Sequence, residues 1–283
     1  MNRYQTDRIV QKTAGSFSVG ERQVPDGETI AAVVVDTLSL LFPGFFQTGT
    51  PVLESIAARL AEQIDIALRL FGPAEAGCDA EEITAEYISR LPEIKRILLT
   101  DVEAMYEGDP AAKSREEIIL CYPGFKAIAI YRLAHVLYDM DVPFIPRMMT
   151  EFAHEKTGVD IHPGAQIGEY FFIDHATGIV IGETTVIGDH VKIYQGVTLG
   201  AKSFEVDKNG NPVKNIKRHP NIGNNVVIYA NATILGGKTY IGDNSIIGAS
   251  TWIIESMPAG SRILHSPKTE NAELFWGDNG SGI

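Results

Sequence analysis

The sequence contains few cysteines. Cys78 and Cys121 are its two cysteines, and their spacing matches no metal-binding motif. This excludes a disulfide framework, and it excludes a zinc site built on several cysteines. We expect both side chains to be buried structural thiols. A chain with so few cysteines suits a reduced compartment, so we expect a cytoplasmic protein.

The sequence also lacks long apolar runs and an excess of positive charge. No stretch of roughly 18 apolar residues occurs, so we expect no membrane span. The N-terminal sequence MNRYQTDRIVQ has no apolar segment of the kind found in signal peptides. The net charge is −12, which argues against a nucleic-acid-binding protein. Small anionic cofactors remain possible ligands, because a local basic pocket can form on an acidic protein.

The first half of the chain has the apolar spacing of helices. The 283 residues are 45% hydrophobic, enough for one large domain or two ordinary ones. The turn signals FPG, FGP, YPG and IPR separate the apolar segments, and Pro92 is expected to begin one of the helices. We expect an all-helical domain over residues 1–157. The segments with helical spacing are 27–42, 51–71, 79–91, 92–109 and 125–140.

From Val159 onward the apolar period changes to six. Ile161, Ile167, Ile173 and Ile179 form one such series, a second begins at Ile181, and further series continue to Ile253. The register slips at 179–181 and 234–241, so we expect small insertions there. A period of six fits neither an α-helix nor an antiparallel meander. A short repeat with an inward aliphatic residue predicts a parallel β-helix, with about 18 residues in each triangular coil. We therefore predict an α+β protein, with a β-helix of four to five coils over residues 158–265.

Two segments do not follow the repeat of six. Residues 201–220 are polar and contain the turn signal NGNP, so we expect them to loop out of one face of the β-helix. Residues 266–283 are polar and glycine-rich, and they end in Ile283. We expect these last residues to form a flexible tail.

Three of the seven histidines have charged neighbours that suit proton transfer: His162, His175 and His219. Asp160 precedes the pair Asp174-His175 by nearly one coil. We therefore expect Asp160 to reach His175 from the neighbouring coil. A carboxylate bound to one ring nitrogen increases the basicity of the other, which suits removal of a proton from a hydroxyl that attacks a thioester.

No cysteine or serine lies beside His175 as a nucleophile, so direct attack by the acceptor is favoured over a covalent acyl-enzyme. The residues alone leave open that His162 and His175 only cap corners of the coils. The remaining histidines, 135, 154, 190 and 265, are expected in the core or at the surface.

A series of motifs resembles a known family. DIHPGAQIG, IDHATGIVIGET, GVTLG and RHP occur in this order, after EGDPAAKS and YPGFKAIAIYRLAH. From about residue 107 to about residue 256, the chain resembles the serine acetyltransferases, which are hexapeptide-repeat acyltransferases. They make O-acetyl-L-serine from L-serine and acetyl-CoA in cysteine biosynthesis. The resemblance implies a left-handed β-helix, a homotrimer or a dimer of trimers, and active sites between subunits.

The resemblance also implies roles for single residues. His175 of DHATG corresponds to the general base, and Asp160 of DIHP corresponds to the carboxylate that orients it. Asp109 and Asp174 correspond to contacts of the serine ammonium group. Two carboxylates at one end of a zwitterion and a cation at the other would hold both of its charges.

Arg218 and His219 correspond to contacts of the serine carboxylate and hydroxyl. His162 is expected to be structural. The family binds acetyl-CoA as a co-substrate in the groove between β-helices, and we expect neither a tightly bound cofactor nor a metal. The corresponding small residues here are Gly200, Ala201, Ala230 and Ala249. Lys238, Arg262 and Lys268 are further candidates for phosphate contacts.

The chain departs from the family pattern in three places. Lys217 precedes Arg-His-Pro where an aspartate is common, the 202–217 loop is long, and the Gly-x-Pro-Ala ending after the last coil is missing. The resemblance also implies feedback inhibition by L-cysteine and binding of cysteine synthase through the terminal residue Ile283.

Three other functions remain as alternatives. One is a related acyltransferase that acts on a sugar or on another amino acid. Another is a β-helical carbonic anhydrase, which needs three histidines on a zinc ion at an interface between chains. The last is a β-helical scaffold without catalytic activity.

Overall fold

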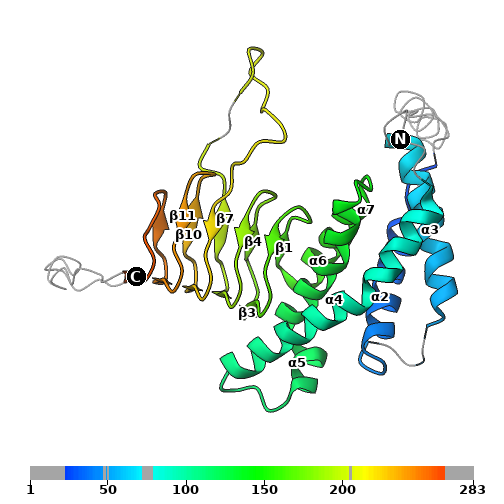
Figure 1. Ribbon diagram of the computed structural model, residues 1–283, viewed down its shortest axis with the longest axis horizontal. Coiled ribbons are helices and arrows are strands. Elements are labelled where there is room, and N and C mark those ends of the chain that lie inside the picture. Colours follow the sequence, from blue (N-terminus) through cyan, green and yellow to red (C-terminus); the bar gives the residue numbers. More distant parts are fainter. Residues whose placement is uncertain (1–22, 47–48, 50, 72–78, 204–205, 265–283) are drawn as a thin grey trace, which may run out of the picture.

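The computed structural model describes residues 23–46, 49, 51–71, 79–203 and 206–264. Helices occupy one end of the molecule and a coiled stack of short strands occupies the other (Figure 1). No helix in the described part of the chain is long and apolar enough to cross a membrane. The predicted tail and Cys78 lie outside these residues. Cys121 is exposed, so the prediction that it is buried is wrong.

The helical region contains α2 to α7. Its helices are α2 (Gly27–Leu41), α3 (Leu53–Phe71), α4 (Ala80–Gly108), α5 (Arg115–Cys121), α6 (Pro123–Asp139) and α7 (Ile145–Thr157). Side-chain caps mark several of their starts: Asp26 accepts a hydrogen bond from the amide of Thr29, and Asp79 accepts one from Glu81. Helix α7 ends at Gly158, which has the left-handed conformation at φ 71°.

Helix α4 is longer than the sequence predicts. Pro92 was expected to begin a new helix, but it lies inside one continuous helix of 29 residues. The loss of one backbone hydrogen bond at a proline is tolerated here because Leu91 and Ile94, on either side of it, are both buried in the core. As a result, α4 extends without a break to Gly108, and the helix terminus brings Asp109 to the first coil of the β-helix.

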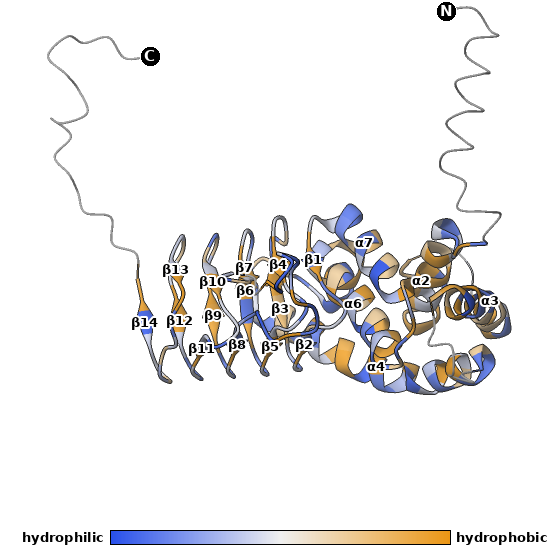
Figure 2. Ribbon diagram, turned by 90° about the horizontal axis from the view of Figure 1, so that it is seen from above, coloured by the Kyte–Doolittle hydropathy of each residue, from blue (hydrophilic) through white to orange (hydrophobic). Residues whose placement is uncertain are grey.

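The strands of the second region form three parallel sheets, as the period of six predicts. The sheet orders are β1-β4-β7-β10-β13, β11-β8-β5-β2 and β14-β12-β9-β6-β3. Inward residues such as Ile161, Ile181 and Leu199 align from coil to coil and are buried. Figure 2 shows the resulting apolar positions along the strands. The strands are β1 (Asp160–Ile161), β2 (Gln166–Ile167), β3 (Phe172–Asp174), β4 (Val180–Ile181), β5 (Val186–Ile187), β6 (Lys192–Tyr194), β7 (Thr198–Gly200), β8 (Asn221–Ile222), β9 (Val227–Ile228), β10 (Thr233–Leu235), β11 (Tyr240–Ile241), β12 (Ile246–Ile247), β13 (Trp252–Ile253) and β14 (Arg262–Ile263).

The first coil is longer than the next one, and the slip of register predicted at 179–181 lies at its enlarged corner. Asp160 aligns with Val180, and Val180 aligns with Thr198 in the next coil, so the first coil is the longer of the two. The difference arises at one corner. Residues 175–179 connect β3 to β4, but only residues 195–197 connect β6 to β7. The enlarged corner is the segment that contains the DHATG motif.

The segment between β7 and β8 extends away from the coils (Figure 1). It returns to the coils at Lys217, Arg218 and His219, where all three residues bond to the corner between β4 and β5. The end of the long loop is therefore attached to a defined place on the β-helix.

Helix α6 attaches the helical region to the first coil. Arg132 donates hydrogen bonds to the carbonyls of Ile167 (3.2 Å) and Gly168 (2.7 Å). It also forms a buried double hydrogen bond with Asp101 of α4. Tyr131, the residue before Arg132 on α6, donates a hydrogen bond from its hydroxyl to the carbonyl of Ala165. These contacts fix where α4 ends relative to the first coil.

Candidate active site

The enlarged corner of the first coil presents the predicted base. Asp174 ends β3, and His175 and Ala176 follow with φ of 56° and 65°. Positive φ costs energy in residues other than glycine, so two in succession indicate a conformation that packing must maintain. Nδ1 of His175 lies 3.7 Å from Oδ1 of Asp174, and 68% of the His175 side chain is exposed. The structure thus places an accessible imidazole beside a carboxylate.

Asp109 lies close to this corner, at the C-terminus of α4. The hydroxyl of Tyr122 donates to one oxygen of Asp109, and the amide of Ala111 donates to the other at 2.8 Å. The hydrogen bond from Tyr122 is the main cause that holds the pKa of Asp109 below its usual value, and the charges of His175 and Lys192 add to it. Asp109 is therefore ionised at neutral pH, as a contact for an ammonium group must be.

Lys192 connects this acidic corner to the helical region. Its Nζ donates to the carbonyl of Gly108 at 3.0 Å and lies 4.6 Å from the centre of the Phe172 ring. Helix α4 has no basic residue in its own last turn. Lys192 therefore supplies a positive charge at the negative end of the α4 dipole. The sequence patterns did not identify Lys192, because its partner Gly108 lies far away in the chain.

A second cluster lies at the corner between β4 and β5. Arg218 forms an ion pair with Glu183, and the hydroxyl of Tyr138 donates to Glu183 at 3.2 Å. The side chains of Arg218 and Glu183 are both about one-quarter exposed or less, so the guanidinium is held in a defined direction. Sequence reasoning identified Arg218 but not Glu183, although Glu183 belongs to the quoted motif IDHATGIVIGET.

His219 completes the second cluster and is 7% exposed. Its ring lies against the backbone of Gly182, where a side chain would come within about 2 Å of the imidazole. Burial is the main cause that lowers the pKa of His219 to about 4, and the nearby charges of Arg218 and Lys217 act in the same direction. His219 is therefore neutral at physiological pH.

Asp160 does not contact His175 as predicted. Within the described residues, its one ion pair is with Arg147, at 3.7 Å. The prediction assumed a coil of regular length, whereas the enlarged corner aligns Asp160 with Val180 and leaves His175 beside Asp174. The catalytic role of Asp160 rests on the family resemblance.

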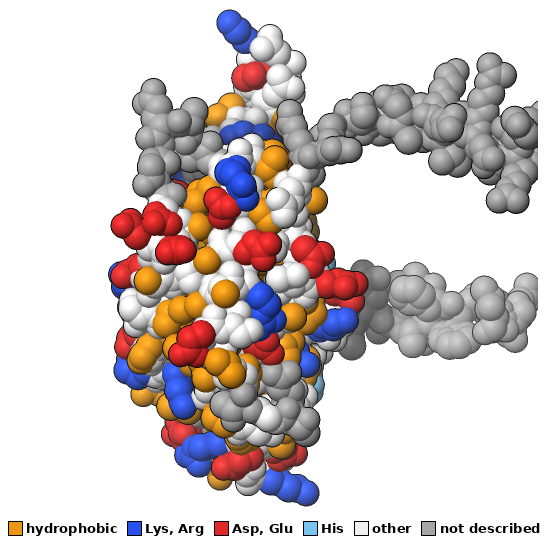
Figure 3. Space-filling view, turned by 90° about the vertical axis from the view of Figure 1, so that its right-hand side faces the viewer, with side chains coloured by type: hydrophobic (Ala, Val, Ile, Leu, Met, Phe, Trp, Pro, Cys, Tyr) orange, Lys and Arg blue, Asp and Glu red, His pale blue; other side chains and the backbone are white. Residues whose placement is uncertain are grey.

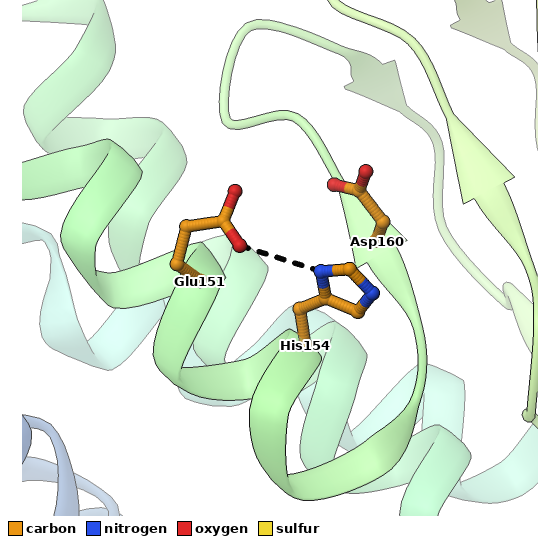
Figure 4. Close-up of side chains that lie close together, drawn as sticks. All are labelled: Glu151, His154 and Asp160. Atoms are coloured by element: carbon orange, nitrogen blue, oxygen red, sulfur yellow. Dashed lines mark hydrogen bonds and ion pairs between the residues drawn. The ribbon is translucent and has the colours of Figure 1, made fainter.

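Asp160 faces helix α7 in the structure. Figure 4 shows it opposite Glu151 and His154, and one oxygen or nitrogen atom from each of the three lies within 4.8 Å of the others. Arg147 forms ion pairs with both Glu151 and Asp160. We interpret the group as an ion-pair cluster where the helical region meets the first coil, because an arginine already compensates its carboxylates.

His162 is half-buried, and burial is the main cause that lowers its pKa. Its Nδ1 accepts a hydrogen bond from the amide of Gly164 at 3.1 Å. In the part of the chain that the structure describes, His162, His175 and His219 do not form a group with metal-ligand distances. The zinc site of a β-helical carbonic anhydrase would lie at an interface between chains, so the zinc content of the purified protein is the test of that alternative.

The comparisons with known proteins agree with the motifs. Residues 51–129 match the N-terminal domain of serine acetyltransferases. The plasmid serine acetyltransferase of Synechococcus elongatus is 43% identical over 281 residues, which cover 92% of this chain and 86% of the relative. The chain belongs to the serine acetyltransferase family.

Solved serine acetyltransferases have the same fold. Serine acetyltransferase 1 of Entamoeba histolytica, in complex with L-cysteine, has a TM-score of 0.71 and 39% identity, and the match covers 85% of this chain and 87% of that one. The Neisseria gonorrhoeae enzyme in complex with serine has a TM-score of 0.59 and 31% identity, over 85% of this chain and 92% of that one. The β-helix is left-handed, as the family resemblance implied.

The four small residues that were predicted to contact acetyl-CoA lie in two pairs. Gly200 ends β7 and Ala201 follows it, at the carboxyl ends of the strands of the β1-β4-β7-β10-β13 sheet. Ala230 and Ala249 precede β10 and β13, at the amino ends of the strands of the same sheet, and the carbonyl of Ala230 accepts from the amide of Ser250 at 2.9 Å. The assignment of these four residues stays a prediction.

A basic cavity of about 310 Å³ lies beside Gly200 and Ala201. Four cationic side chains line it: Lys202, Lys217, Arg218 and Lys238. Of these, sequence reasoning proposed only Lys238 as a phosphate contact. Lys217 donates to Oδ1 of Asn221 at 2.6 Å. This lysine, at a position where the family often has aspartate, therefore adds positive charge to the wall of the cavity.

Proposed function

We propose that this protein transfers the acetyl group of acetyl-CoA to the hydroxyl of L-serine, giving O-acetyl-L-serine and CoA in the first step of cysteine biosynthesis. The observation that supports it best is the enlarged corner, where exposed His175 lies beside the carboxylates of Asp174 and Asp109. This corner can bind an amino group and accept a proton from the neighbouring hydroxyl.

The proposed chemistry needs no acyl-enzyme. The serine hydroxyl oxygen attacks the thioester carbonyl while His175 accepts the hydroxyl proton, and a tetrahedral oxyanion forms. The C–S bond then breaks, and CoA leaves as a thiol after it takes the proton from the His175 imidazolium. Asp109 and Asp174 hold the substrate ammonium group. Arg218 provides a planar cation for the substrate carboxylate.

The site is assembled between copies of the chain in this proposal. His175 lies at the corner before β4, whereas Arg218 and His219 are bonded to the corner after it. A homotrimer of β-helices would bring the first corner of one copy to the second corner of its neighbour. A dimer of such trimers is compatible with the same site. The basic cavity would hold the phosphates of acetyl-CoA.

Serine-dependent release of thiol from acetyl-CoA is the measurement that tests this function. We expect release of one CoA per O-acetyl-L-serine formed, and much slower release with sugars or with other amino acids. Release that is independent of serine would contradict the proposal. Stoichiometric zinc together with hydration of carbon dioxide would favour the carbonic anhydrase instead, and no release with any acceptor would favour a scaffold.

L-Cysteine has the same ammonium and carboxylate groups as L-serine, with a thiol in place of the hydroxyl. We infer that it binds at the same residues and inhibits the enzyme by feedback. The Entamoeba histolytica relative in complex with L-cysteine supports this inference. We also propose a cytoplasmic location, on the basis of the low cysteine content.

Deletion of residues 274–283 is expected to abolish binding to cysteine synthase and to leave acetyl transfer unchanged. The proposed contact is the carboxyl-terminal Ile283, which lies outside the described residues, as does the whole deleted segment. Binding can be measured by calorimetry with purified cysteine synthase, and acetyl transfer by thiol release. Binding that survives the deletion would exclude the tail as the docking segment.

A further inference from the structure

Thr184 makes an unusual set of hydrogen bonds with the end of the long loop. Its backbone amide donates to Nδ1 of His219 at 3.1 Å, and its hydroxyl oxygen lies 2.9 Å from the same nitrogen. The hydroxyl also accepts from the amides of Arg218 (3.0 Å) and His219 (3.1 Å). A single threonine therefore binds both the backbone and the ring of the loop's last residues.

These contacts determine which nitrogen of His219 carries the proton. A backbone amide can only donate, so Nδ1 must offer its lone pair to Thr184. The Thr184 hydroxyl already accepts two hydrogen bonds, so its own proton is free to point at Nδ1. In a neutral imidazole whose Nδ1 is an acceptor, the proton is on Nε2. The hydrogen-bond network thus selects the Nε2–H tautomer.

The charges around His219 keep the ring neutral. Arg218, Lys217 and His162 disfavour a positive charge on it, and Glu183 favours one. The side chain is also almost completely buried. Burial disfavours the charged form of an imidazole, so the pKa of His219 is lowered to about 4.

Nε2 of His219 has no hydrogen-bond partner within the described residues. Although this edge of the ring packs against Gly182, Nε2 is not among the fully buried polar atoms that lack a partner. A neutral ring with a free Nε2–H can donate a hydrogen bond to an oxygen, but it has no free lone pair with which to accept a proton.

We propose that Thr184 is a positioning residue that holds His219 as a neutral Nε2–H donor to an oxygen of the bound amino acid. His219 therefore binds substrate but does not act as a base, and His175 is the base of the reaction. The identity of the ligand, an amino acid, rests on the proposed function. The tautomer and the charge of His219 can be measured without any substrate.

Nitrogen NMR of histidine-labelled protein tests the proposal directly, with His219→Gln to assign the signals. In the wild type we expect His219 to show an unprotonated Nδ1 and a protonated Nε2, unchanged between about pH 5.5 and 8.5. In Thr184→Val, which keeps the shape of the side chain but loses its hydroxyl, the backbone amide still donates to Nδ1, so we expect the Nε2–H tautomer to persist with a shifted Nδ1 resonance.

Two matched variants separate this effect from a general disturbance. Thr184→Ser retains the hydroxyl and should restore the wild-type signals. Thr185→Val changes the neighbouring threonine, whose hydroxyl is buried and has no partner among the described residues, so it should leave His219 unchanged. A wild-type His219 that is protonated on Nδ1, or that titrates near pH 6–7, would overturn the proposal.

Kinetics supply the second measurement. We expect Thr184→Val to raise KM for serine about tenfold, as the loss of a well-placed hydrogen bond does, with KM for acetyl-CoA within about twofold of wild type. Equal kinetic effects of Thr184→Val and Thr185→Val would contradict the positioning role. If the wild type shows no serine-dependent release, the proposed function fails, and the NMR result still decides the tautomer.

Discussion

His175→Asn is expected to lower kcat for serine-dependent CoA release by a factor of about 10²–10⁴, because general-base catalysis is lost. Asparagine is the appropriate replacement because His175 has a left-handed backbone with φ of 56°, which asparagine tolerates. The variant should fold normally, because the His175 side chain is largely exposed. Steady-state kinetics over a range of serine concentrations measure the effect, with circular dichroism as the check on folding.

His190→Asn is the matched control for this prediction. His190 also occupies a corner of the β-helix with φ of 56°, but its ring stacks on Tyr170 at 4.3 Å between ring centres. It lies away from the acidic corner, so its replacement should leave kcat within about twofold of wild type. If the two variants have the same kcat, His175 is not the base.

A related comparison identifies the carboxylate that orients His175. The structure places Asp174 beside the ring, whereas the family resemblance assigns the role to Asp160. Loss of the orienting carboxylate should lower kcat. Loss of a contact to the substrate ammonium should mainly raise KM for serine. Asp174→Asn and Asp160→Asn therefore separate the two assignments by which kinetic constant each one changes.

The repeat of six predicted the β-helix because every inward aliphatic residue must pack on its equivalent in the next coil. Ile161, Ile181 and Leu199 show this, since each aligns with the next and is buried. The same repeat indicated the enlarged corner, because the aliphatic series slips by two positions between Ile179 and Ile181. The pattern does not show which side chains meet across such a corner. In the structure Asp160 pairs with Arg147 and forms no ion pair with His175 among the described residues.

Among the candidate site residues, those that lie in a short motif could be named from the sequence, and their functional roles stay predictions. His175, Arg218 and His219 all lie in short motifs, and the structure places each at a corner of the coils. The residues that support them could not be found in the same way. Thr184 binds His219 across 35 positions of the sequence, and Lys192 binds Gly108 across 84. Contacts of that separation depend on the coil register, which the motifs do not contain.

The mixed surface of the helical end agrees with the charge composition. Figure 3 shows acidic and basic side chains interspersed on the face that it presents. This face is not the continuous basic surface that nucleic-acid binding requires. Positive charge is instead concentrated around one small cavity, which is lined by Lys202, Lys217, Arg218 and Lys238. A cavity of this size suits the phosphate groups of a cofactor rather than a nucleic acid.

Arg132→Met is expected to lower the free energy of unfolding by about 3–5 kcal/mol, because it leaves a buried carboxylate without its partner. The Arg132 and Asp101 side chains are 7% and 0% exposed, and two hydrogen bonds of 2.6 and 2.8 Å join them. Asp101 also accepts from the amide of Phe171 at 2.9 Å, so its charge cannot turn toward solvent without breaking a contact to the first coil. Denaturant unfolding at a fixed protein concentration measures the loss.

Arg96→Met provides the control, because Arg96 joins the helical region to nearly the same place on the first coil. Its Nη1 donates to Glu169 at 3.0 Å, but both side chains are substantially exposed. An exposed ion pair contributes little in water, so this variant should unfold almost as the wild type does. If both variants lose a similar free energy of unfolding, the destabilisation comes from a weaker attachment of the helices to the first coil. A large loss for Arg132 alone would locate it in the uncompensated charge of Asp101.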